Sequence, residues 1–149
     1  RELIPVDDYL VPALFFAPDH LLPKRAGSVT SQIDLPPTIM GILGGEYRSP
    51  FFGRDVLSSD GDANFAIIIY NKKRYGIVSG SQLVVLTETG ETLAYERSGV
   101  NASWLPVTVS PQHQEISRNA RALLGAAEKL LISGCYNTAA HSNNVKQSV

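Results

Sequence analysis

Four short runs of β-branched and aromatic residues are the strongest constraint on the fold of this chain. They cover residues 65–70, 75–79, 82–87 and 92–97. Only two to four residues separate neighbouring runs, for example the pair Gly80-Ser81. Gaps this short connect antiparallel strands, because a parallel connection needs a crossover of a dozen or more residues. The sequence therefore predicts a four-stranded antiparallel meander, and one face of it must be covered.

An amphipathic segment that follows the four runs is the candidate cover. Ser110 suits a helix N-cap, Pro111 suits the first helical position, and Gly134 supplies a stop. Between them, apolar residues recur at helical spacing on one stripe: Ile116, Ala120, Leu123, Leu124, Ala127, Leu130 and Leu131. We predict a helix that lies on the meander, followed by a frayed tail over residues 138–149.

The first third of the chain predicts a shorter helix. Asp34 is placed to cap it, with its carboxylate accepting a backbone N–H two or three residues on, and Pro36-Pro37 fits the first turn. Gly44-Gly45 supplies a left-handed stop after nine or ten residues. Next, Phe51-Phe52-Gly53 offers two aromatic anchors and a flexible residue, which would pin the following loop to the body of the domain.

Two further patterns define the predicted organisation. Residues 11–18 form an apolar run bracketed by prolines, which predicts a strand buried on both faces of a parallel sheet. Residues 58–64 are rich in turn formers and predict a linker. The expected fold is an α/β segment over residues 1–57, the linker 58–64, an α+β layer of meander and helix over 65–137, and the tail 138–149.

Composition excludes several classes of function. The net charge of −1 and the pI of about 6.3 leave no basic field for nucleic acid. No apolar run approaches the length of a transmembrane helix, and residues 1–8 carry acids where a signal peptide would be apolar. With a single cysteine, Cys135, the chain can form no internal disulfide. From the acidic opening over residues 1–8 we expect a chain that is cut from the middle of a longer protein.

Residues that suggest metal chemistry do not group into a motif. His20, His113 and His141 lie far apart, and only His20 has a carboxylate beside it, Asp19. Residues 60–64 open like a calcium loop. However, Phe65 stands at its sixth position, where glycine is needed, and Asn71 at its twelfth, where glutamate is needed.

Nucleophilic chemistry has no better candidate. Cys135 follows a helix stop with no paired base, which favours a half-buried apolar role. The chain contains no G-x-S-x-G elbow, and its glycines follow a helix instead of opening one, so they form no phosphate loop. Asp34 and Asp55 are interpreted as structural carboxylates.

Four segments together resemble one protein family. They are residues 14–18 (LFFAP), 31–38 (SQIDLPPT), 42–44 (ILG) and 51–55 (FFGRD). In this order they are similar to the C-terminal part of lipoteichoic acid synthase-like and phosphoglycerol transferase proteins. Those proteins belong to the sulfatase branch of the alkaline phosphatase superfamily. The resemblance covers residues 10–57 and, more loosely, 65–136.

The resemblance implies a parent enzyme with N-terminal transmembrane helices and a catalytic domain on the extracytoplasmic face of a bacterial membrane. Its threonine nucleophile attacks phosphoglycerol or sulfate esters of the envelope, and Glu, Thr, Asp and His hold a divalent metal such as Mn²⁺. None of those residues maps onto this chain, and Cys135 lacks the Cys-x-Pro/Ala-x-Arg context of formylglycine sulfatases. We therefore expect no catalytic, cofactor-binding or metal-ligating residue here.

Two functions stay open at this point. In the first, the chain is an inactive segment whose partner is the N-terminal part of the catalytic domain. Apolar surface around residues 14–17 and 35–43 would then be uncovered, which would also allow a homodimer. In the second, the chain is a non-catalytic interaction module that binds a protein or an envelope partner.

Overall fold

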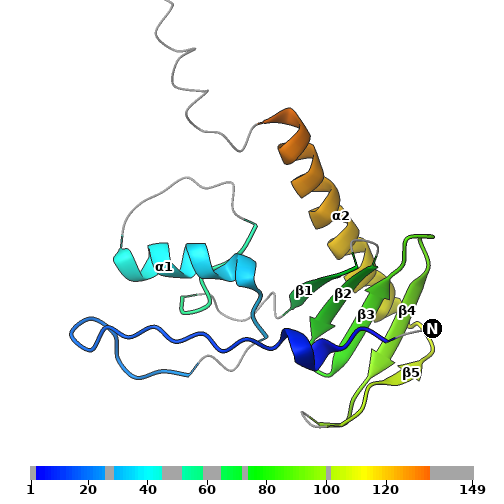
Figure 1. The fold of residues 1–149 in the computed structure, drawn as a ribbon, viewed down its shortest axis with the longest axis horizontal. Coiled ribbons are helices and arrows are strands. Elements are labelled where there is room, and N and C mark those ends of the chain that lie inside the picture. The colour runs from blue at the N-terminus through cyan, green and yellow to red at the C-terminus, as the bar shows by residue number, and fades with distance from the viewer. Residues whose placement is uncertain are drawn as a thin grey trace, which may run out of the picture.

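The computed structural model describes residues 3–25, 29–44, 52–58, 65–71, 74–99 and 102–134. Its centre is an open antiparallel sheet with the strand order β1-β2-β3-β4-β5 (Figure 1). The strands are β1 (Ala66–Tyr70), β2 (Arg74–Ser79), β3 (Gln82–Leu86), β4 (Thr92–Glu96) and β5 (Leu105–Val107). The predicted meander is confirmed and gains a fifth strand. Sequence patterns missed β5 because it has three residues, one of them Pro106, which is more typical of a loop.

Helix α2 (Pro111–Ser133) covers one face of this sheet. Ser110 Oγ accepts a hydrogen bond from the His113 backbone N–H, and Gly134 ends the helix with a φ of 67°. From its apolar stripe, Ala120 is buried in a cluster with Ile77, Val84 and Leu86, and Ile116 and Leu124 pack against that cluster. The predicted helix, its cap and its stop are therefore confirmed.

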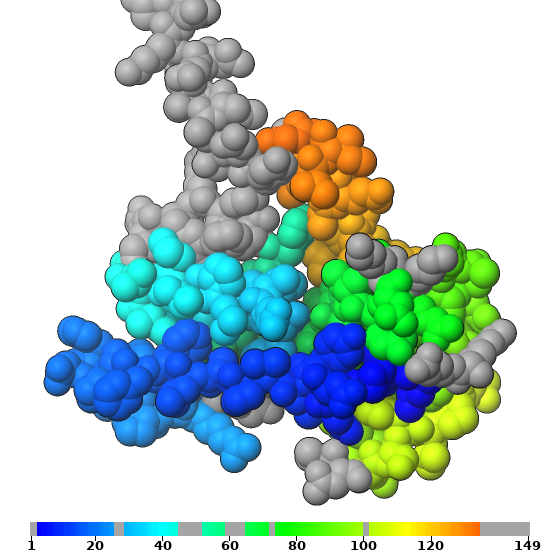
Figure 2. All heavy atoms as spheres, viewed as in Figure 1, coloured from blue at the N-terminus to red at the C-terminus, as the bar shows by residue number. Residues whose placement is uncertain are grey.

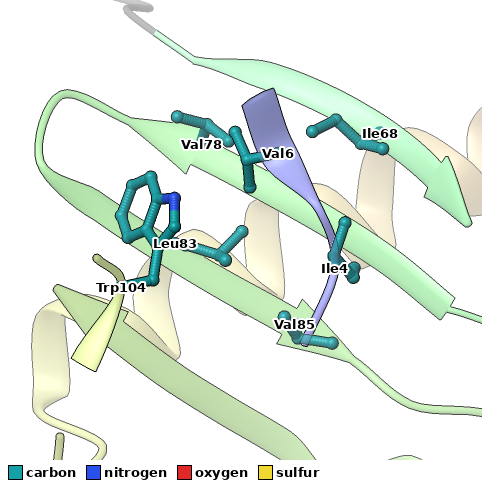
Figure 3. Close-up of a cluster of buried hydrophobic side chains, with 7 residues drawn as sticks. All are labelled: Ile4, Val6, Ile68, Val78, Leu83, Val85 and Trp104. Atoms are coloured by element: carbon teal, nitrogen blue, oxygen red, sulfur yellow. The ribbon is translucent and has the colours of Figure 1, made fainter. Parts of the chain in front are cut away.

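The opposite face of the sheet is covered by the first residues of the chain. Residues 3–7, here called the strap, cross the strands, and Ile4 and Val6 point into the sheet (Figure 3). They form one buried cluster with residues from β1, β2, β3 and the loop before β5: Ile68, Val78, Leu83, Val85 and Trp104. The end of the strap is the start of a short 3-10 helix, η1 (Val6–Tyr9). The sequence pattern assigned no element to these residues, although the sheet cannot bury its second face without them.

The predicted short helix is α1 (Leu35–Leu43), preceded by the 3-10 turn η2 (Gln32–Asp34). Pro36 and Pro37 lie in its first turn, and Gly44 ends it with a φ of 68°, so the helix and its stop are confirmed. In Figure 1, α1 lies beside the sheet and not on either of the faces that α2 and the strap cover.

The predicted strand over residues 11–18 is wrong for the described chain. Residues 10–17, here called the arm, are extended but belong to no strand. No described strand lies beside the arm to pair with its backbone, and Pro12 and Pro18 lack an N–H. Leu14 is 88% exposed and Phe16 84% exposed. Figure 2 shows the arm and the turn after it, in blue, running along the molecular surface below α1.

The predicted uncovered apolar surface is confirmed at both places. On α1, Ile39 and Leu43 are exposed, as are Leu14 and Phe16 on the arm. The proposed division of the chain at residues 58–64 stays a prediction. The strap, which precedes this division in the sequence, packs on the sheet, which follows it. The tail 138–149, residues 60–64, Gly45, Phe51, Cys135 and His141 lie outside the described residues. None of the helices in the described ranges is long and apolar enough to cross a bilayer.

Leu83 provides a test of the sheet core. It is fully buried on β3, in the cluster under the strap. We expect Leu83→Ala to lower the free energy of unfolding by about 2–5 kcal/mol, because truncation leaves a cavity in a packed core. Urea denaturation measures this loss. The matched control is Leu105→Ala, an exposed leucine on edge strand β5, which should change stability by less than about 0.5 kcal/mol. Equal losses would contradict the two-face core.

Candidate functional site

The family-like segments meet around Asp34, which is buried. Its Oδ2 accepts a hydrogen bond from the Ser31 backbone N–H at 2.8 Å, and its Oδ1 accepts one from the Arg54 backbone N–H at 3.0 Å. One carboxylate therefore joins the entry of α1 to a loop twenty residues further along the chain. A buried carboxylate that accepts two backbone hydrogen bonds is well satisfied.

Thr38 forms the second part of this junction. It is fully buried on α1, and its hydroxyl donates to the Asp34 carbonyl at 2.7 Å. The same oxygen accepts a hydrogen bond from the Val56 backbone N–H at 3.1 Å. Asp34 and Thr38, with the backbone of residues 53–56 that they hold, are here called the clasp.

Two glycines let the clasp close. A Cβ on Gly53 would overlap the Ile33 carbonyl oxygen, and a Cβ on Gly41 would overlap the Asp55 carboxylate. The Asp55 Oδ1 in turn accepts a hydrogen bond from the Leu57 N–H at 2.9 Å. The loop therefore lies against the helix closely enough that only glycine fits at these two places.

Arg54 extends the clasp toward the sheet. Its guanidinium donates to the Val29 carbonyl at 3.0 Å, and Val29 packs against the cluster under the strap. The segments that carry the resemblance are therefore brought together in space and are connected to the sheet layer through this arginine.

Sequence reasoning was partly right about the clasp. Asp34 and Asp55 are structural, as interpreted, and Asp34 stands at the predicted N-cap position of α1, but the prediction that its carboxylate caps the helix is wrong. Its carboxylate makes no capping hydrogen bond to α1 and instead holds Ser31 and Arg54, which lie outside the helix. Thr38 was missed as a key residue. The one available signal was a lone hydroxyl among apolar helix positions, four residues after the aspartate.

A second polar cluster lies where α2 begins. His113 is almost fully buried, and its Nδ1 lies 2.9 Å from Ser110 Oγ. Its Nε2 faces Glu96 Oε1 at 3.6 Å and has no hydrogen-bond partner within the described part of the chain. The order serine, histidine, glutamate resembles a nucleophile relay.

The hydrogen bonds show a helix cap instead. The Ser110 backbone N–H donates to His113 Nδ1 at 3.1 Å, so this ring nitrogen is an acceptor and the ring proton is on Nε2. Ser110 Oγ accepts from the His113 backbone N–H at 3.3 Å. Serine and histidine are therefore both used in the reciprocal cap of one helix turn, with no free base to activate the hydroxyl.

The remaining sequence candidates stay apart. Asp19 and His20 are exposed in a turn at the end of the arm. Among the described residues, no three His, Cys, Asp or Glu side chains come close enough together to hold a metal ion. Within the described ranges, the clasp is thus the best-defined arrangement of polar residues. Its side chains hold backbone segments in place through hydrogen bonds.

No protein-family model matches this sequence. A crystal structure of a protein in the alkaline phosphatase superfamily from Vibrio parahaemolyticus is similar to the chain, with a TM-score of 0.61 and 24% sequence identity. The chain has the fold of part of that protein. The match covers 73% of this chain and 26% of the Vibrio protein, so the chain spans about a quarter of that protein's length. The similarity agrees with the predicted fold class, and at this identity it shows the fold alone.

Thr38→Val tests the clasp, since valine keeps the shape and removes the hydroxyl. The Val56 N–H and the Asp34 carbonyl then lose their partner, and we expect a local loss of about 1–3 kcal/mol. Hydrogen exchange of the Arg54 and Val56 amides should become faster. Thr30→Val, at an exposed threonine, is the control and should leave both amides unchanged. Unchanged protection in Thr38→Val would contradict the assigned role.

Gly53→Ala tests the close approach of loop and helix. The added methyl group meets a backbone carbonyl that cannot rotate away, so we expect a loss of about 3 kcal/mol, the upper end for overpacking. Thermal unfolding measures it. Gly99→Ala is the matched control, because nothing lies near its Cβ position. If both variants unfolded at the same temperature as the wild type, the clasp would not need a glycine at residue 53.

Proposed function

We propose that this chain is the C-terminal part of the catalytic domain of a sulfatase-branch enzyme. The parent acts on phosphoglycerol or sulfate esters of the cell envelope at the extracytoplasmic face of a bacterial membrane. The chain completes the fold and forms one wall beside the active site, while preceding polypeptide supplies the nucleophile and the metal ligands.

The observation that carries this proposal is the uncovered apolar surface of the arm and α1. Leu14, Phe16 and Leu43 are largely exposed, although the clasp and the cluster under the strap are well packed. Burying each such side chain contributes about 1.5–3 kcal/mol, so water is an unfavourable environment for this surface. The fold similarity supports a polypeptide partner, because about three-quarters of the Vibrio protein lies outside the matched region.

The clasp supports a positioning role within that domain. It joins the entry of α1 to the loop 53–56 through buried hydrogen bonds. A loop held in this way loses little further conformational entropy when a partner or substrate packs against it. The chain's proposed contribution to catalysis is therefore a rigid wall.

The divalent metal implied by the resemblance does not fit the described residues of this chain. A metal site needs at least three converging donors, and the described part brings together no such group of His, Cys, Asp and Glu. The proposal accordingly assigns Mn²⁺, or a similar ion, to preceding polypeptide.

The interaction module is the second candidate, and one observation favours it. Both faces of the sheet are covered from within the chain, by α2 on one side and by the strap on the other. The sheet layer thus has a core of its own, as a binding module requires.

Activity and complementation test the leading proposal. We expect the purified chain with Mn²⁺ to hydrolyse neither bis-p-nitrophenyl phosphate nor p-nitrophenyl sulfate. Co-expression with the polypeptide encoded upstream of Arg1 should give a complex that hydrolyses one of them. Turnover by the isolated chain, with Mn²⁺ binding in calorimetry, would contradict the proposal.

The arm provides the matched variants for this experiment. Leu14→Asp with Phe16→Asp should abolish assembly, because charges would enter the covered interface. Leu105→Asp alters an exposed leucine on β5 and should assemble normally. Assembly that tolerated the arm variants would place the partner elsewhere.

A further inference from the structure

The strap is fixed to the sheet almost entirely by side chains. Ile4 and Val6 are buried, while Pro5 between them is exposed, so alternate side chains face the sheet up to the point where η1 begins at Val6. The backbone hydrogen bonds of the described strap residues are local: Val6 N–H to Ile4 O, Asp8 N–H to Pro5 O, and Leu10 N–H to Asp7 O. None among the described residues joins the strap to a strand. Such a segment can leave without breaking the sheet ladder.

The sheet surface under the strap is shaped for an aliphatic side chain. Gly76 on β2 lies below Ile4, and a Cβ added there would be 3.0 Å from Ile4 Cδ1 and 3.4 Å from Leu83 Cδ1. A glycine in a strand weakens the strand, so its presence here marks a place where something approaches closely. Val6, two residues after Ile4 on the strap, is buried in the same cluster (Figure 3).

A cation lies beside these two aliphatic positions. The Arg97 guanidinium stacks over the Trp104 ring, 4.5 Å from its centroid, and its Nη1 lies 3.4 Å from Asp7 Oδ1. The Arg97 side chain is largely buried, whereas that of Asp7 is exposed. The arginine is therefore pre-positioned by the indole to receive a carboxylate at the residue after the second aliphatic side chain.

The strap leaves one polar group of this surface unsatisfied. Trp104 is more than nine-tenths buried, and none of the described residues offers a hydrogen-bond acceptor to its Nε1–H. In Figure 3 the indole nitrogen is on the side of the ring that faces Val6. A segment that placed an acceptor oxygen there would remove a desolvation cost that the strap does not remove.

From these contacts we infer that the face of the sheet under the strap is a binding site for a short peptide segment that turns at its second aliphatic residue, as the strap does, and that the strap fills this site in cis. The preferred segment has an aliphatic residue, any residue, a second aliphatic residue and then an acid. The aliphatic side chains occupy the positions of Ile4 and Val6, and the acid pairs with Arg97. The site lies on the sheet layer and does not depend on the proposed catalytic role.

Peptide binding to the full chain tests this inference. In the variant Ile4→Ser/Val6→Ser the strap is released, and a fluorescein-labelled peptide of the strap sequence, LIPVDDYL, is added. We expect the variant to bind this peptide at least about tenfold more tightly than the wild type, because the tethered strap competes at high effective concentration. Fluorescence anisotropy measures both affinities.

Two control peptides check the recognised pattern. LSPSDDYL, without the aliphatic side chains, should not bind. LIPVNDYL, without the first acid, should bind about threefold more weakly, and the difference should disappear at 1 M salt, where charge pairs are screened. Equal binding of all three peptides would overturn the inference.

The single tryptophan gives a direct signal from the site. Trp104 is the only tryptophan in the chain, so its indole N–H produces one NMR resonance. That resonance should shift when LIPVDDYL binds the variant. A folded variant whose tryptophan resonance and anisotropy do not respond would overturn the inference. If the variant is unfolded, excess LIPVDDYL should restore a cooperative melt, and failure to do so would overturn it equally.

Discussion

The structure depends on one constraint, which is that the central strands of the sheet are apolar on both faces. On β3, Leu83 and Val85 point to one side, and Val84 and Leu86 point to the other. A sheet of this kind is stable only when both faces are removed from water. Helix α2 covers one face through residues close in sequence. The other is covered by the strap, which lies more than fifty residues before β1, so the first and last described segments of the chain enclose one sheet.

The clasp organises the rest of the described chain by different means. Two backbone N–H groups of a distant loop, those of Arg54 and Val56, donate hydrogen bonds to the side chains of Asp34 and Thr38 at α1. This packing is tight enough to require Gly41 and Gly53, yet the neighbouring arm and the outer side of α1 remain exposed. A rigid polar junction beside uncovered apolar surface is the arrangement expected where further polypeptide packs, and the proposed function rests on this contrast.

Much of the candidate site could be anticipated from the sequence, but not how its residues interact. The motif order around Asp34 and Asp55 identified the residues that come together, and their structural role was correct. Of the two partners of Asp34, Ser31 lies three residues before it in a Ser-x-x-Asp capping box, which is a local pattern. Arg54 was not predictable, because it reaches Asp34 through the path of the chain and not through local spacing. The strand predicted over residues 11–18 was wrong for a related reason. Its apolar character was read correctly, but a strand also needs a neighbour, and no described strand provides one.

Local sequence patterns are sufficient to set the elements whose causes are local. Short turns set the antiparallel order of β1 to β4, and Ser110, Pro111 and Gly134 set the limits of α2. Gly44 set the end of α1 in the same way, because a left-handed residue stops a helix wherever it stands. Tertiary structure alone decided that the strap closes the second face of the sheet and that Pro106 lies in a fifth strand. It also decided that Thr38 holds a loop eighteen residues away. These contacts join residues far apart in the chain, and their energy comes from burial and hydrogen bonds that exist only once the chain is folded.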